Sequence, residues 1–129
     1  YSSFSTATLI DVYTEESLNN SLHYQVKSFA SIYLENQGTT FVKHNLPIEA
    51  QLSSINKIMV DDYDRDQKLD IVIAGNLYSS EVETPRNDGS YGLVLKGKGN
   101  GEFKPIPVNE SGFYTKGDVK DLKKIIKET

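Results

Sequence analysis

The chain has 129 residues, of which 37% are hydrophobic and 25% charged, with a net charge of -4 and no cysteine. These values are typical of one ordinary globular domain and argue against wholesale disorder. The lack of cysteine excludes disulfides, zinc thiolate sites and cysteine nucleophiles, and the lack of a basic cluster interleaved with aromatic residues argues against a nucleic-acid partner.

The N-terminal segment carries a helix signal. Residues 9–13 fit a short helix or a strand equally well. Thr14 is a plausible N-cap, followed by two glutamates that suit the positive end of a helix dipole. Apolar residues then recur at spacings of 4, 4 and 3, at Leu18, Leu22, Val26 and Phe29. The pattern predicts an amphipathic helix over residues 15–27, and we expect residues 1–27 to form a helical arm.

Short strands are predicted for the rest of the chain. Residues 28–34 and a return strand from Phe41 flank the turn signal Asn36-Gln37-Gly38, which favours a hairpin that ends before Pro47. Further strands are expected at residues 57–60, 71–74, 91–95 and 103–108, the last of them an edge strand because it contains two prolines. Residues 76–90 read as a long polar connection, and residues 118–126 fit either a helix or a strand.

The apolar runs are too short for a membrane span, since residues 71–74 are among the longest. The chain opens on Tyr1, with neither a methionine nor a signal-like apolar segment. We therefore expect a cut or processed piece of a larger protein.

The acidic run from Asp62 to Asp70 predicts a calcium site. Aspartates stand at positions 1, 3, 5 and 9 of this run, and residues two apart in a tight loop can turn their oxygens toward one point. Calcium takes about 6 to 8 oxygen ligands, so four carboxylates and the carbonyl of position 7 would nearly complete its shell. The predicted ligands are Asp62, Asp64, Asp66, Asp70 and the carbonyl of Lys68.

This acidic run has two other interpretations. In a solvated acidic turn, four converging carboxylates would repel one another without a cation. An EF-hand requires a glutamate at position 12, where this chain has Ile73, and an exit helix where this chain has strand-type residues. The EF-hand interpretation fails on both requirements, whereas a structural calcium loop between two strands satisfies the pattern.

The chain also repeats a strand, glycine-turn and phenylalanine pattern. Phe41 and Phe103, which open the two return strands, lie 62 positions apart. A period of this length with several strands per unit is typical of propeller blades or a related array. We expect a mainly β fold with about two propeller-like blades, at residues 28–76 and 77–129, of which the second is incomplete.

These motifs resemble FG-GAP/VCBS-type repeats from about residue 28 to residue 103. The similarity lies in the Asp62 to Asp70 run with Ile71-Val72 after it, Asn36-x-Gly38-x-x-Phe41 before it and Gly99-x-Gly101-x-Phe103 beyond. The helix signal and the strand that follows are also similar to bacterial members related to the ASPIC/UnbV group. Such repeats build calcium-bearing β-propellers, including integrin α-subunit heads and many bacterial secreted or surface proteins. One position departs from the family pattern, because Gln67 replaces the usual glycine and would adopt a left-handed conformation at a cost of roughly 1 kcal/mol.

The resemblance implies a non-catalytic, calcium-stabilised interaction or adhesion module of a secreted, periplasmic or surface protein. No Gly-x-Ser-x-Gly elbow surrounds any serine, so no hydrolase triad has an anchor in the sequence. The expected partner is a protein or carbohydrate ligand. The alternatives are a recognition appendage of a larger extracellular enzyme and an assembly element that self-associates through unpaired strand edges.

Overall fold

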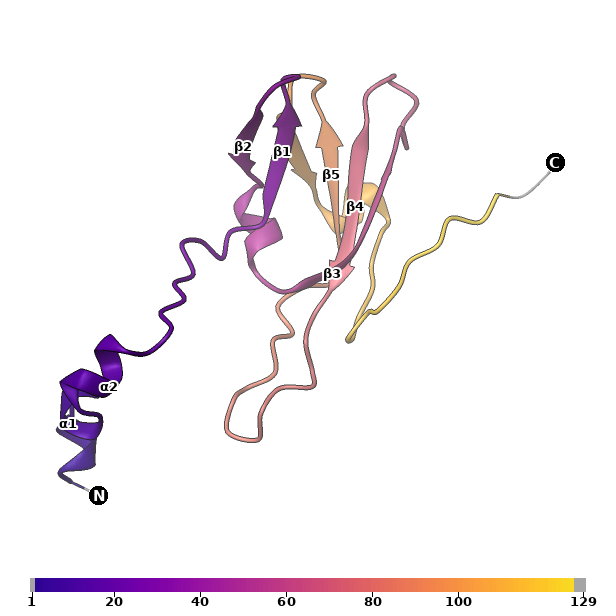
Figure 1. Ribbon diagram of the computed structural model, residues 1–129. Coiled ribbons are helices and arrows are strands. Elements are labelled where there is room, and N and C mark those ends of the chain that lie inside the picture. The colour runs from indigo at the N-terminus through magenta and orange to yellow at the C-terminus, as the bar shows by residue number, and fades with distance from the viewer. Residues whose placement is uncertain (1, 127–129) are drawn as a thin grey trace.

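A computed structural model describes residues 2–126, which form two separate antiparallel sheets. The mainly β prediction is confirmed, and neither sheet closes into a barrel among these residues. The first sheet is the hairpin of β1 (Ile32–Asn36) and β2 (Phe41–Asn45). The second has four strands in sequence order: β3 (Ile55–Asp61), β4 (Asp70–Gly75), β5 (Leu93–Gly97) and β6 (Phe103–Ile106) (Figure 1).

The predicted hairpin is confirmed, and its turn chemistry explains it. Gly38 takes a φ of 88°, which a glycine adopts without strain, and its N–H donates to the side chain of Asn36 at 2.8 Å. The strand β6 lies at the edge of the larger sheet, as its prolines predicted, because an edge strand needs hydrogen bonds on one side only.

The core lies between the larger sheet and the connection that follows β2. That connection contains the 3-10 helix η2 (Ile48–Gln51), whose Ala50 is buried with Ile71, Ile73 and Leu95. The strand β4 is buried along its whole length because β3 and β5 pair with its two edges. The packing of this central strand therefore holds its end residues, Asp70 and Gly75, in place.

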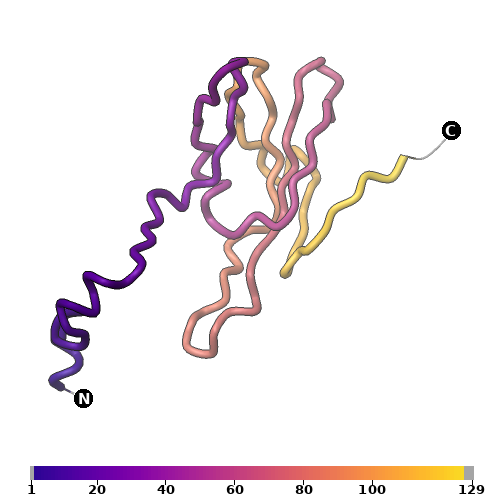
Figure 2. The backbone as a smooth tube through the Cα atoms, in the orientation of Figure 1, coloured from indigo at the N-terminus to yellow at the C-terminus, as the bar shows by residue number. Residues whose placement is uncertain are grey.

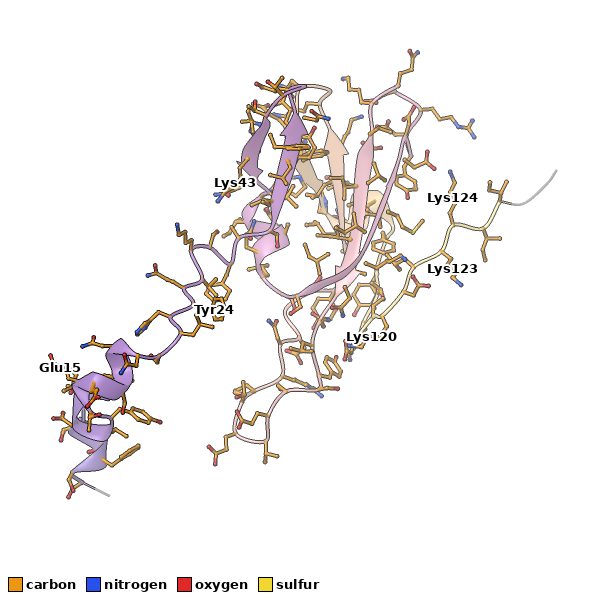
Figure 3. All side chains as sticks on the ribbon, viewed as in Figure 1. Glu15, Tyr24, Lys43, Lys120, Lys123 and Lys124 are labelled. Carbon is orange, nitrogen blue, oxygen red and sulfur yellow. The ribbon has the colours of Figure 1, made fainter. Side chains whose placement is uncertain are left out.

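The predicted helix over residues 15–27 is wrong in its extent. The arm contains three short elements, η1 (Phe4–Thr6), α1 (Leu9–Val12) and α2 (Glu15–Asn19), and Thr14 caps α2 by accepting from the Ser17 N–H. Leu22 is 78% exposed and Val26 is 63% exposed, so their apolar stripe packs against nothing in the described chain. Isolated short helices are marginal in water, and Figures 1 and 2 show this arm extending away from both sheets, with Glu15 and Tyr24 remote from them in Figure 3.

The C-terminal segment forms neither of the two expected elements. It runs as irregular chain beside the free edge of β3, where the Val119 N–H donates to the Gly75 carbonyl at 3.0 Å and the Asn56 side chain donates to the Val119 carbonyl at 2.9 Å. Lys57 and Asp121 add an ion pair at 2.8 Å. A short helix, α3 (Val108–Ser111), precedes this segment. No helix among residues 2–126 combines the length and the apolar character needed to cross a membrane.

Candidate metal centre

Three of the predicted ligands converge in the loop that joins β3 to β4. Asp62, Asp64 and Asp70 each place one carboxylate oxygen so that all three oxygens lie within 4.8 Å of one another. Two oxygens bound to one calcium ion stand at most about 4.6 to 5.2 Å apart, twice the metal–oxygen distance. The three carboxylates therefore meet the distance requirement for a shared ion.

Asp70 is the most firmly positioned member of the group. It begins the buried strand β4 and is 3% exposed. Its Oδ1 accepts from the Gly97 N–H at 2.9 Å, and its Oδ2 accepts from the Tyr63 N–H at 3.1 Å. A carboxylate offers about four lone-pair positions, so these two hydrogen bonds leave capacity for a cation.

The loop backbone wraps around the side chain of Asp62. The two carboxylate oxygens of Asp62 accept from the N–H groups of Asp66 and Gln67, at 3.0 and 2.9 Å. Gln67 has a φ of 68°, the left-handed conformation predicted from the glycine it replaces, and Arg65 has a φ of 64° that was not predicted. The two left-handed residues allow a short loop to turn its aspartates inward.

The other two predicted ligands are placed differently. The carboxylate of Asp66 points to the amino group of Lys96, with Oδ2 at 3.1 Å from Nζ, and its Oδ1 accepts from the Lys68 N–H at 3.0 Å. The Lys68 side chain lies 4.0 Å from Asp66 and packs beside Gly99. The structure thus brings together Asp62, Asp64 and Asp70, whereas the Asp66 carboxylate and the Lys68 carbonyl remain predicted ligands.

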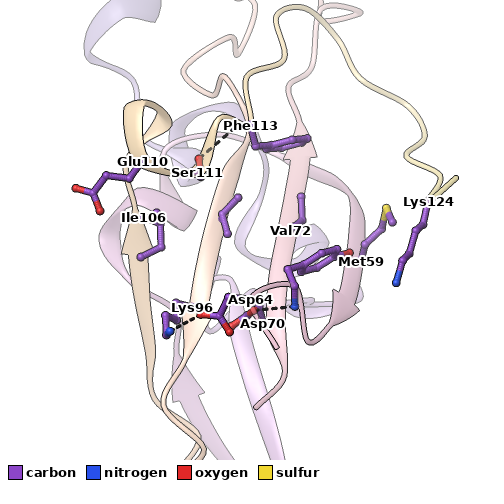
Figure 4. Close-up of a pocket in the computed structure, with 12 residues that line it drawn as sticks. Met59, Asp64, Asp70, Val72, Lys96, Ile106, Glu110, Ser111, Phe113 and Lys124 are labelled. Carbon is purple, nitrogen blue, oxygen red and sulfur yellow. Dashed lines mark hydrogen bonds and ion pairs between the residues drawn. The ribbon is translucent and has the colours of Figure 1, made fainter. Parts of the chain in front are cut away.

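Lys96 is a member of the site that the loop sequence did not reveal. It lies on β5, and its amino group pairs with Asp64 (Figure 4). The same amino group also pairs with Asp66. Hydrogen bonds to these two carboxylates raise the pKa of Lys96, and the same contact lowers the pKa of Asp66. At neutral pH, Lys96 therefore supplies one positive charge at the edge of the cluster.

A second lysine neutralises the strand end beside the loop. Lys124, in the C-terminal segment, pairs with Asp61 at the end of β3, and this contact lowers the pKa of Asp61. The Lys124 amino group also lies 5.9 Å from the centre of the Tyr63 ring. Two lysines from distant parts of the chain thus pair with three of the five acidic residues at positions 61–70, namely Asp61, Asp64 and Asp66.

The donor set fits a hard divalent cation. All three converging groups are carboxylates, which calcium and magnesium prefer, and no cysteine or histidine joins them among the described residues. Three carboxylates supply fewer oxygens than the roughly 6 to 8 that calcium takes, so Asp66, backbone carbonyls or water would complete the shell.

A hollow of about 560 Å³ lies beside this site on the same face of the larger sheet. Asp64, Asp70 and Lys96 stand at one end of it, and its floor is apolar, formed by one residue from each strand: Met59, Val72, Val94 and Ile106 (Figure 4).

Comparison with protein families, curated proteins and solved structures gave no match to this chain.

Proposed function

We propose that this chain is a non-catalytic module of propeller-type β units stabilised by calcium. The observation that supports the proposal is the convergence of Asp62, Asp64 and Asp70 in a tight connection between two paired strands. A cation there would relieve the repulsion between the carboxylates and would tie the end of β3 to the start of β4.

The role proposed for calcium is structural. An ion that binds only the folded chain stabilises it by RT ln(1 + [L]/Kd), about 1.4 kcal/mol at a ninefold excess over Kd. Extracellular modules work with calcium affinities in the range of about 0.1 to 1 mM, so a modest site fits a secreted, periplasmic or surface protein that binds a protein or carbohydrate. The resemblance to FG-GAP/VCBS-type repeats supports the same assignment.

Thermal unfolding in calcium, in magnesium and in chelator tests this proposal. We expect calcium to raise the midpoint of the wild type and Asp64→Asn to remove most of that rise, because Asp64 is exposed and its replacement leaves the β4 core intact. Asp88→Asn is the matched control, since Asp88 makes a comparable exposed ion pair with Arg86 in the distant 76–90 connection. A wild-type midpoint that is equal in calcium and in chelator would show that the loop is not a calcium site.

A further inference from the structure

The β1–β2 and β5–β6 hairpins are equivalent in register, so the repeat seen in the sequence is also present in the structure. Leu34 lies two residues before Asn36, and Asn36 pairs with Phe41. In the same way Leu95 lies two residues before Gly97, and Gly97 pairs with Phe103. Each leucine is thus a diagonal neighbour of its phenylalanine on one face of its hairpin.

The connections that follow the two hairpins are also equivalent. Pro47 is the N-cap of η2 after β2, and Pro107 is the N-cap of α3 after β6. η2 buries Ala50 against the larger sheet, whereas Ser111 of α3 lines the hollow on the opposite side of that sheet. Among residues 2–126, α3 therefore has no further sheet in the position that the larger sheet takes relative to η2.

Equivalent residues differ sharply in exposure. Leu95 is fully buried and Phe103 packs against the core, but Leu34 is 51% exposed and Phe41 is 67% exposed. We call the surface of Ile32, Leu34 and Phe41 the rear face of the chain. On the rear face, Leu34 and Phe41 are thus exposed among the described residues, although their counterparts Leu95 and Phe103 belong to the core or pack against it.

The opposite side of the larger sheet is also apolar. Met59, Val72, Val94 and Ile106 are successive cross-strand partners, so they form one row across all four strands. Val72 is buried there, while its three row neighbours are half-buried beneath a hollow that Ser111 and Phe113 also line. We call this row, the floor of the hollow, the front face. Within the chain, the corresponding front surface of the first hairpin presents Tyr33, whose ring packs edge-on against Phe103 at 5.6 Å. Val94 is the counterpart of Tyr33, since each precedes the hairpin leucine by one residue.

We infer that a second copy of this chain docks its rear face on the front face of the first, with Phe41 of one copy against Val94 of the other. This contact repeats, between copies, the contact of Tyr33 with Phe103 within one copy. Its two surfaces differ, so the association is head-to-tail and allows chains longer than two. The inference rests on the repeat in the proposed function but not on calcium.

Sedimentation velocity over a range of protein concentration, up to about 1 mM, tests the inference. We expect the wild type to form dimers and longer species, both in calcium and in chelator. Phe41→Asp removes the rear face and Met59→Lys removes the front face, so each variant alone should be monomeric. An equimolar mixture of the two should give dimers that do not grow, because each partner supplies one intact face.

Phe29→Asp is the matched control, since Phe29 is 91% exposed but lies outside both faces, and it should associate as the wild type does. Circular dichroism checks that each variant is folded, and Leu34→Glu replaces Phe41→Asp if the latter is not. A wild type that stays monomeric throughout, or a mixture that stays monomeric while the wild type associates, would overturn the inference. Association in calcium that is lost in chelator would also overturn the inference. A thermal unfolding midpoint that is equal in calcium and in chelator, together with intact association, would reject the calcium site and leave the docking in place.

Discussion

The amino group of Lys96 lies 3.1 Å from Oδ2 of Asp66 and pairs at the same time with Asp64. The lysine comes from β5 and the aspartates come from the loop before β4, so the pairing of these two strands brings them together. Lys96 therefore holds a positive charge where a divalent cation would draw on the same carboxylates.

Replacement of Lys96 by methionine should tighten calcium binding. Lys96 competes with the cation for Asp64 and Asp66, and removal of such an exposed ion pair should lower the Kd by up to about fivefold. Isothermal titration calorimetry measures this change. Lys98→Met is the control, because Lys98 pairs with Glu102 in the neighbouring turn at 3.0 Å and should leave the Kd unchanged. A weaker affinity in Lys96→Met would show that the lysine organises the loop for the ion.

Gln67→Gly should stabilise the loop and tighten calcium binding. Gln67 adopts a φ of 68°, which costs a residue with a Cβ roughly 1 kcal/mol more than it costs glycine. The expected result is a higher unfolding midpoint in chelator and a lower calcium Kd. Leu69→Gly is the control, since Leu69 lies in the same loop, is 63% exposed and is not among the residues with positive φ, so glycine there should relieve no backbone strain. Equal effects of the two substitutions would contradict the strain argument.

Local patterns predicted the elements that local chemistry decides. The turn at Gly38, the edge position of β6 and the left-handed Gln67 all follow from one or two residues, and all are present. The helix over residues 15–27 was wrong because its spacing predicts an apolar face but not a surface that would bury it. Helices this short depend on such a surface.

The site was predictable in its loop but not in its surroundings. The spacing of Asp62, Asp64 and Asp70 predicted their convergence, because these ligands belong to one short segment. Lys96 and Lys124 reach the cluster from β5 and the C-terminal segment, 26 or more positions beyond Asp70. Only the strand pairing and the path of the chain beside β3 place them there, and neither can be predicted from the loop sequence.

Asn76 is another residue that the sequence did not single out, and Asn76→Ala should be strongly destabilising. This residue is 2% exposed, and its amide group donates to the carbonyls of Ser90 and Gly117 and accepts from the Ser53 hydroxyl and the Ser90 N–H. Loss of a buried group with several partners costs about 3 kcal/mol or more, because those partners are left unsatisfied.

Urea unfolding measures the effect at Asn76. Asn100→Ala is the matched control, since Asn100 is exposed and accepts one local hydrogen bond from the Glu102 N–H at 3.2 Å. The control should lose no more than about 1 kcal/mol. Similar losses at the two positions would show that the buried network contributes little.

Acidification should release the C-terminal segment from the sheet through Asp118. The amino group of Lys120 lies 2.7 Å from this carboxylate and lowers its pKa below the ordinary 3.8, with a smaller contribution from the Tyr78 N–H. Because the folded pKa lies below the unfolded one, this stabilisation is fully present above about pH 4 to 5 and is lost as the pH falls through the folded pKa. Urea unfolding between pH 6 and pH 2, roughly the range in which carboxylates titrate, should show a smaller acid loss in Asp118→Asn than in the wild type.

Lys120→Met should also flatten the acid limb, because it removes the main cause of the low pKa. Lys123→Met is the control, since Lys123 is 84% exposed and its nearest carboxylate, that of Asp121, is 3.9 Å away. Hydrogen exchange at Val119 gives a local reading, because its N–H donates to the Gly75 carbonyl only while the segment lies beside β3. Protection at Val119 that persists below the pH at which Asp118 is protonated would show that this carboxylate does not hold the segment in place.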